Sequence, residues 1–368
     1  MTRSILSLFL FLLIAQTASA QVTPVGNEPG AAPTATARHI SFASIPAAAR
    51  GETASVFSAQ LGPQRPAPVP APVLNFSAQR RRGSFVGYID DPVVSSKVRV
   101  RFEMGLHSSV PDRAEFFYAK CGCYRGLPSN DPAFDPNAKG PFSDIVGDLN
   151  FQQFYVFAEY AATERFSAFA ELPLRWIQPQ TPSGLVNQSG VSDLRAGVKF
   201  GLATNEQMSL TAQVKTFLQS GDSRNGLGTG HASVEPGLLY HRNLSDRAAI
   251  ATQVSLWIPF GGSDGVPTTV DGKFAGSVLS YGIGPSIEVY SSENVSFAPV
   301  VELVGWRVLN GYQTTTPSEA GGTNIVNIKF GARATWANGT SIYGGYGKAL
   351  TDADWYDDIL RFEYRWSF

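Results

Sequence analysis

Hydrophobic and polar residues alternate along the chain from Lys97 to Phe368. In the stretch KVRVRFEMGLH, the apolar positions fall on one side and the charged positions on the other. A repeat of two residues is typical of a β-strand, whereas a helix repeats about every 3.6 residues. The pattern therefore predicts strands with one apolar and one polar face.

The same alternation recurs twelve times, which predicts an all-β protein. The expected strands span residues 97–107, 151–162, 166–177, 192–202, 208–219, 231–243, 248–260, 274–290, 295–307, 323–336, 341–349 and 359–368. An even number of antiparallel strands brings both ends of the array to the same side of a barrel.

The connections between these strands alternate in length. Every second connection is a turn of at most five residues, such as TER or ANGT, and the others run from about 9 to about 43 residues. Short turns at one rim and long loops at the other are typical of outer-membrane barrels. We therefore predict a closed antiparallel transmembrane β-barrel of about 12 strands over residues 97–368. Its short turns and both of its ends are expected on the periplasmic side.

The last strand has the most pronounced two-faced pattern. In LRFEYRWSF, the apolar face is formed by Leu360, Phe362, Tyr364, Trp366 and Phe368, and the chain stops on that last aromatic residue. An apolar, aromatic face of this kind suits lipid, where every backbone polar group must be paired within a closed sheet. The strand resembles the C-terminal signal by which the barrel assembly machinery recognises outer-membrane barrels, so we expect the assembly machinery and outer-membrane lipid as partners.

Eighteen charged residues inside the strands fall on the polar parity, which predicts a charged lumen. A basic side chain at mid-bilayer on the lipid face would cost about 2–4 kcal/mol. The predicted lumen-lining charges are Arg99, Arg101, Glu103, Glu159, Glu171, Arg175, Asp193, Arg195, Lys199, Lys215, Glu235, Glu288, Glu302, Lys329, Arg333, Arg361, Glu363 and Arg365. Because this set mixes both signs, only weak charge selectivity is expected.

Two features of the predicted lumen each admit two interpretations. Inward-parity aromatic residues either contact an apolar or aromatic solute or fill the lumen as packing; they are Tyr155, Phe157, Phe169, Phe217, Trp257 and Trp306. Barrel closure brings the first and last strands together and gathers Arg99, Arg101, Arg361 and Arg365 on one wall. That wall either attracts an anion or a carboxylated solute or forms an ionic ladder along the seam.

The first 96 residues differ from the rest of the chain. Residues 1–20 have the basic, apolar and small-residue regions of a cleaved signal peptide. Residues 21–96 follow as a Pro/Ala-rich segment, including PQRPAPVPAP, that we predict to be disordered and periplasmic. The protein is therefore expected in the outer membrane of a diderm bacterium, exported through that peptide.

Composition excludes several other classes of function. The net charge is −1 and charged residues make up 16% of the chain, so nucleic acid is not expected as a partner. Four His and two Cys, without zinc-site spacing, predict no metal and no cofactor. Cys121 and Cys123 lie in the longest loop, where the oxidising compartment favours a local disulfide.

Three segments carry a family resemblance: FLQSGDSRNGLGTGHASVEPGLLYHRNLSDRAAI (217–250), VVELVGWRVLNG (300–311) and YGGYGKALTDADWYDDILRFEYRWSF (343–368). They resemble the outer-membrane β-barrel family named for the meta-pathway of phenol degradation, which is also called transporter-like. In that family a Pro-Thr-Gly-Asp usually precedes the glycine-rich loop, and this chain has Gln219-Ser220-Gly221-Asp222 instead. The resemblance implies a barrel that passes small compounds and brings no catalytic residues.

Together these observations predict a passive outer-membrane channel for a small, aromatic or carboxylated solute and no enzymatic activity. One alternative is a structural or adhesive barrel with a closed lumen. A further alternative is a barrel lipid hydrolase, because His107-Ser108-Ser109 and His231-Ala232-Ser233 place a His and a Ser two residues apart. Neither pair is followed by the Asn-Gly of the barrel phospholipases.

Overall fold

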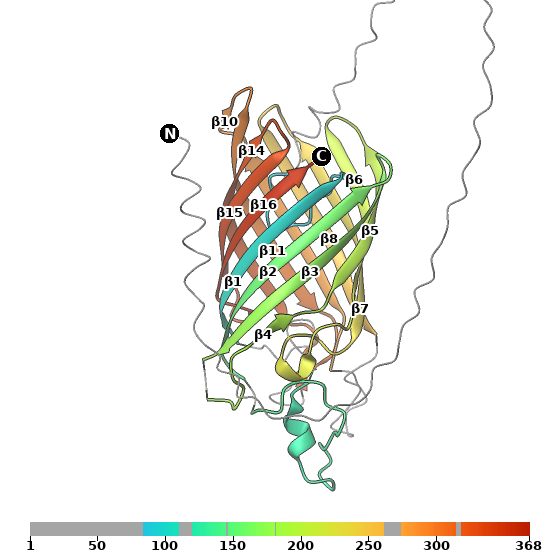
Figure 1. Ribbon diagram of the computed structural model, residues 1–368, viewed down its shortest axis with the longest axis vertical. Helices are drawn as coiled ribbons and strands as arrows, with labels where there is room; N and C mark the ends of the chain where they lie inside the picture. Colours follow the sequence, from blue (N-terminus) through green and yellow to red (C-terminus); the bar gives the residue numbers. More distant parts are fainter. Residues whose placement is uncertain (1–83, 110–119, 145, 181, 261–273, 314–317) are drawn as a thin grey trace, which may run out of the picture. The chain divides into compact units, whose positions relative to one another are not determined.

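Strands of alternating sequence form one antiparallel sheet that closes on itself (Figure 1). The computed structural model describes residues 84–109, 120–144, 146–180, 182–260, 274–313 and 318–368. The predicted signal peptide and the predicted disordered residues 21–83 lie outside the described residues.

The wall is a closed barrel of 12 strands. These are β1 (Lys97–Ser108), β2 (Leu149–Ala161), β3 (Phe166–Pro179), β5 (Arg195–Thr204), β6 (Met208–Phe217), β7 (Ala232–Asn243), β8 (Ala248–Phe260), β9 (Val278–Ile287), β11 (Val295–Val308), β14 (Asn324–Trp336), β15 (Thr340–Ala349) and β16 (Asp358–Ser367). Each strand pairs with its neighbour in the chain, and β1 also pairs with β16, so that no barrel strand is left with an open edge.

Shorter elements lie at the rims of the barrel. β4 (Gln188–Val191) pairs with β3, β10 (Tyr290–Ser291) pairs with β11, and β12 (Tyr312–Gln313) pairs with β13 (Ser318–Glu319). Two 3-10 helices, η1 (Gly122–Gly126) and η2 (Ser223–Asn225), lie in the long loops at the lower rim of Figure 1. Within the described residues, no helix is long and apolar enough to cross a membrane.

The strand prediction is confirmed for all twelve barrel strands, with most boundaries within three residues. The largest difference is β9, which was predicted over 274–290 and spans Val278–Ile287. Short turns gather at the rim that holds the C-terminus, and long loops gather at the opposite rim (Figure 1). The four short elements β4, β10, β12 and β13 were not predicted, because two to four residues are too few to show a periodic pattern.

The two faces of the wall differ as the alternation predicts. Large apolar side chains are exposed on the outside, including Leu172, Phe200, Val254, Phe330 and Phe362. Most charged residues of the same strands are buried inside, among them Glu171, Lys199, Lys329 and Glu363. A soluble protein has the reverse arrangement, so the outer surface is suited to lipid and the inner surface to water or to ion pairs.

Candidate functional site: a lumen occupied by its own chain

The predicted lumen residues line the inside of the barrel, with two exceptions among the charges. Asp193 precedes β5 and accepts backbone hydrogen bonds from Gly221 (2.9 Å) and Thr229 (2.7 Å), so it holds two long loops together. Glu288 follows β9 and lies half-buried at the short-turn rim. Both were assigned to strand interiors because the predicted strands were too long at those ends.

The arginines of β1 and β16 meet across the seam, as barrel closure requires. Arg99 lies opposite Arg365, and Glu103 lies opposite Arg361. Arg99 pairs with Glu171 at 3.0 Å, and Arg361 pairs with Glu103. Arg101 completes the network by pairing with Glu103 (3.1 Å) and Glu171 (3.4 Å). Of the two interpretations of this wall, the geometry matches the ionic ladder, because each of these guanidinium groups has a carboxylate partner.

Residues 84–96, the lumenal segment, occupy the inside of the barrel. The Pro/Ala-rich composition predicted that they belong to the disordered periplasmic segment, and that prediction is wrong for this stretch. Val86 and Ile89 are buried at 1% and 3% exposure against Ala251, Val300 and Val304 of the wall. The segment has no regular secondary structure, so its backbone polar groups need partners from the wall.

One wall carboxylate binds three consecutive backbone amides of the lumenal segment. The N–H groups of Gly87, Tyr88 and Ile89 donate to the carboxylate of Glu302 at 3.0, 2.9 and 2.8 Å. Glu302 is fully buried. Hydrogen bonds to a charged acceptor are among the stronger ones in proteins, so Glu302 is a principal anchor of the segment.

Close packing against Tyr343 explains the glycine at position 87. A Cβ atom at this position would lie 2.2 Å from the ring of Tyr343, whose side chain is fully buried. Any larger residue would push the segment away from Glu302. Gly87 is therefore required by the close approach of the segment to the wall.

Basic side chains of the wall bind the carbonyl groups of the segment. Arg333 donates to the carbonyl oxygens of Phe85 (3.2 Å) and Val86 (2.9 Å), and Arg361 donates to that of Gly87. Lys199 donates to the carbonyl oxygen of Asp91 at 2.9 Å. Several predicted lumen residues are thus occupied by the chain itself.

Two acidic side chains of the segment form ion pairs with the wall. The carboxylate of Asp90 pairs with Lys215 at 2.8 Å, and that of Asp91 pairs with Lys97 at 2.9 Å and Arg365 at 3.0 Å. The remaining lumenal ion pairs join wall residues to each other, including Glu159 with Lys199 (3.0 Å) and Glu363 with Arg333 (2.8 Å).

The lumenal segment divides the lumen into two wider spaces. On the long-loop side lies a cavity of about 250 Å³, here called the chamber. On the short-turn side lies a space of about 370 Å³ bordered by residues 93–96. A void of about 40 Å³, bordered by Asp90, Asp91 and Arg99, lies beside the segment. A void of that size holds a few water molecules, so the segment is the narrowest part of the path.

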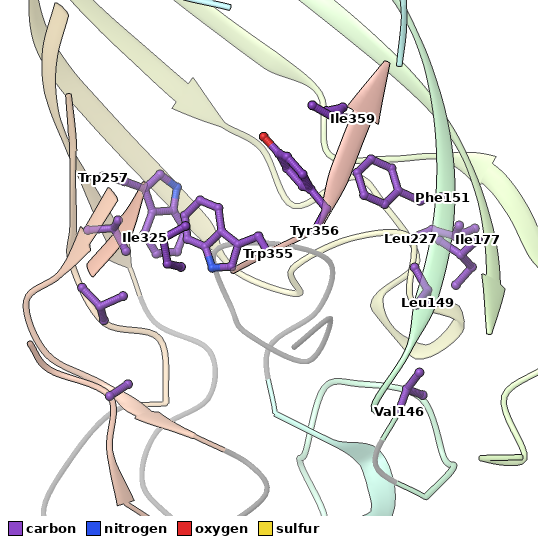
Figure 2. Packing of buried hydrophobic residues seen from close by; sticks show 13 residues of the cluster. Val146, Leu149, Phe151, Ile177, Leu227, Trp257, Ile325, Trp355, Tyr356 and Ile359 are labelled. Atoms are coloured by element: carbon purple, nitrogen blue, oxygen red, sulfur yellow. The ribbon is translucent and has the colours of Figure 1, made fainter. Parts of the chain in front are cut away.

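Aromatic residues cover the chamber on the side of the long loops. Trp355 and Tyr356, from the loop before β16, pack into one buried cluster with Phe151 and Trp257 (Figure 2). The rings of Trp355 and Trp306 lie 4.8 Å apart, and those of Tyr356 and Phe151 lie 6.2 Å apart. Trp257 and Trp306 were predicted as lumenal aromatics, whereas the loop residues Trp355 and Tyr356 were not, because no strand parity applies to a loop.

The walls of the chamber carry more basic than acidic groups. Its basic residues are Arg101, Arg175, Arg195, Lys215, Lys329 and Arg361, and its acidic residues are Asp90, Glu103 and Glu235. Cation–π contacts accompany them: Arg101 lies 4.0 Å from the ring of Tyr155, and Arg361 lies 3.9 Å from that of Tyr88. Phe157 belongs instead to the narrow part of the lumen, where it stacks on Phe169 at 5.5 Å.

The other predicted sites lie away from the chamber or lack the expected contacts. Cys121 and Cys123 form a disulfide in the first long loop. His107 contacts Asp148, and the Nδ1 atom of His231 contacts the carbonyl of Thr229. Within the described ranges, neither histidine shares a hydrogen bond with the serine two residues on, and no three metal-ligating side chains gather.

The terminal residues predicted as the assembly signal lie on the outer face. Phe362, Tyr364, Trp366 and Phe368 are exposed there, and Leu360 is half-buried. Phe368 also donates a backbone hydrogen bond of 3.0 Å to Ser96, where the lumenal segment ends. The last residue is therefore tied to the start of β1.

Comparison with known proteins gives fold-level similarities. An outer membrane channel from Pseudomonas putida F1 has a TM-score of 0.47 at 16% identity and covers 75% of this chain and 96% of its own. The KdgM porin has a TM-score of 0.36 at 10% identity, with coverages of 74% and 99%. LpxR from Salmonella typhimurium has a TM-score of 0.40 at 9% identity, with coverages of 74% and 100%. No family model and no curated protein matches the chain.

Proposed function

We propose that the protein is an outer-membrane channel for passive passage of a small solute, with the lumenal segment as its narrowest part. The observation that carries this proposal is the chamber: a polar cavity of about 250 Å³ inside a barrel whose outer face is apolar. A barrel that served only as a structural wall would have no need of such a cavity.

The chamber also supports an aromatic or carboxylated solute. Six basic and three acidic residues line it, together with Tyr155, Phe217, Trp257, Trp306 and Trp355. Basic groups attract carboxylates, and aromatic walls bind flat apolar rings. The family resemblance in the sequence agrees with a barrel for small compounds. The proposal assigns the barrel no catalytic role.

Single-channel recording in planar bilayers tests the proposal. We expect small, steady openings from the folded protein, because the void beside the lumenal segment is narrow. A variant that lacks residues 84–91 removes most of the segment from the lumen and should raise the single-channel conductance several-fold. If both proteins are folded and neither conducts, the channel function is wrong.

One observation favours a second candidate, a structural barrel with a closed lumen. The lumenal segment is anchored to at least four wall residues, Glu302, Arg333, Lys199 and Lys215. Such anchoring is also what a permanent plug requires. The same recordings separate the two candidates: silence of the intact chain and large openings only without residues 84–91 would favour the plug.

A further inference from the structure

Lys329 is a buried basic residue whose expected partner is bound elsewhere. It lies on β14 directly opposite Glu302 of β11, and its side chain is 2% exposed. The carboxylate of Glu302 is bound by the backbone amides of the lumenal segment. Among the residues that the structure describes, no carboxylate forms an ion pair with Lys329.

Aromatic residues surround the ammonium of Lys329 in place of a carboxylate. Its Nζ atom lies 3.9 Å from the centre of the Tyr88 ring, 5.2 Å from that of Tyr356 and 5.6 Å from that of Trp306. Its hydrogen bond goes to the hydroxyl of Tyr356 at 2.7 Å. A buried ammonium needs compensation for its lost hydration, and cation–π contacts supply part of it. A full negative charge would supply more.

The three rings come from three different parts of the chain. Tyr88 belongs to the lumenal segment, Trp306 to the wall and Tyr356 to the loop before β16. All three, with Lys329, line the chamber. The lumenal segment therefore contributes twice: it supplies one ring and binds the carboxylate that would otherwise pair with Lys329.

We propose that the chamber is a binding site for a small aromatic monocarboxylate, whose carboxylate pairs with Lys329 and whose ring packs on Trp306 and Tyr356. This inference rests on the proposed channel function and specifies its solute. A charge-assisted hydrogen bond from Lys329 fixes the carboxylate. The chamber volume of about 250 Å³ lies below the range of about 300–1,000 Å³ typical of drug-sized ligands, so the ligand is expected to be smaller than a drug-sized molecule.

Binding of benzoate to the folded full-length barrel in detergent tests this site. Titration calorimetry measures affinity, and tryptophan fluorescence reports on the chamber through Trp306 and Trp355. We expect saturable binding of benzoate with quenching of fluorescence. Benzamide is the neutral probe of the same shape, and cyclohexanecarboxylate is the non-aromatic acid. Both should bind at least tenfold more weakly than benzoate.

Two lysine variants locate the site. Lys329→Gln should weaken benzoate binding at least tenfold, and Lys329→Arg should restore part of it. Lys348→Gln is the matched control, because Lys348 lies on the neighbouring strand β15 with an exposed side chain. It should bind benzoate like the unchanged protein. Heat-modified migration on gels confirms that each variant is folded.

The outcomes distinguish this inference from the channel proposal. Equal binding of benzoate and benzamide, or unchanged benzoate binding by folded Lys329→Gln, would overturn the site. Absence of benzoate binding by a protein that conducts ions would also overturn it and leave the channel intact. Benzoate binding that depends on Lys329 supports the site even in a protein that does not conduct.

Discussion

The carboxylate of Glu302 accepts the backbone N–H of Tyr88 at 2.9 Å and so fixes the position of the lumenal segment in the barrel. Two further amides and the hydroxyl of Tyr343 (3.3 Å) donate to the same group. Because one side chain collects so many donors, it is the most direct point at which to loosen the segment.

Glu302→Gln should release the lumenal segment and increase ion flow. An amide has a single acceptor oxygen and no charge, and hydrogen bonds to charged groups contribute about 1.5–3 kcal/mol each. Loss of one such bond raises the population of molecules with a displaced segment about tenfold or more. Single-channel recording should show longer or larger openings. Glu235→Gln is the control, because it also removes one carboxylate charge from the lumen, and Glu235 accepts a hydrogen bond from Ser255 rather than from the backbone of the segment.

The orientation of the barrel can be measured by labelling intact cells. In a background without the two native cysteines, Asn187→Cys in a long loop should react with a bulky membrane-impermeant thiol reagent. Glu164→Cys and Asp246→Cys, both exposed in short turns, should react only after the cells are opened. Labelling of the short turns alone in intact cells would show that the short turns, and not the long loops, face the outside of the cell.

The barrel was predictable because strand parity is local and repeats. Each strand needs one face toward lipid and one toward the lumen, and that requirement appears directly in the sequence. The same parity identified Lys329 and Glu302 as inward residues. It could not show that Glu302 binds backbone amides rather than Lys329, because the donors lie more than two hundred positions away in the chain.

The lumenal segment was missed because its order depends on the barrel. Residues 84–96 follow a Pro/Ala-rich stretch and have no periodic pattern, so their composition alone suggested continued disorder. One signal was present: the sequence SFVGYIDD breaks the Pro/Ala bias with Phe85, Val86, Tyr88 and Ile89. Such residues are costly to leave in water, and they pack against the wall only once the wall has formed.

Deletion of Phe368 should impair assembly. Its side chain extends the aromatic outer face of β16, and its backbone N–H is bonded to Ser96. We expect less folded, heat-modifiable protein in outer membranes and more processed chain in the periplasm. Replacement of Phe368 by Tyr keeps the aromatic ring and should assemble normally. Normal insertion of the protein without Phe368 would show that this residue is not needed for assembly.

The arginines at the seam should act on stability more than on ion selectivity. Arg99 pairs with Glu171, and Arg361 pairs with Glu103. Replacing both arginines by Gln removes one basic partner from each of the two buried carboxylates and leaves them to share Arg101. Breaking a buried pair costs up to about 3–5 kcal/mol. The double variant should therefore unfold at lower urea concentration. Its reversal potential in a salt gradient should change little, because the removed charges were already neutralised.

Removing one carboxylate together with the arginines separates pairing from simple loss of charge. A threefold variant that adds Glu103→Gln to the double variant has no unpaired carboxylate at these positions, because Glu171 keeps Arg101 (3.4 Å) and Arg195 (3.1 Å). If the arginines act as an ionic ladder, this variant should recover most of the lost stability. A folded double variant with normal urea resistance and a large shift toward cation preference would contradict the ladder. That result would mean that the guanidinium groups of Arg99 and Arg361 determine which ions pass, rather than hold the seam together.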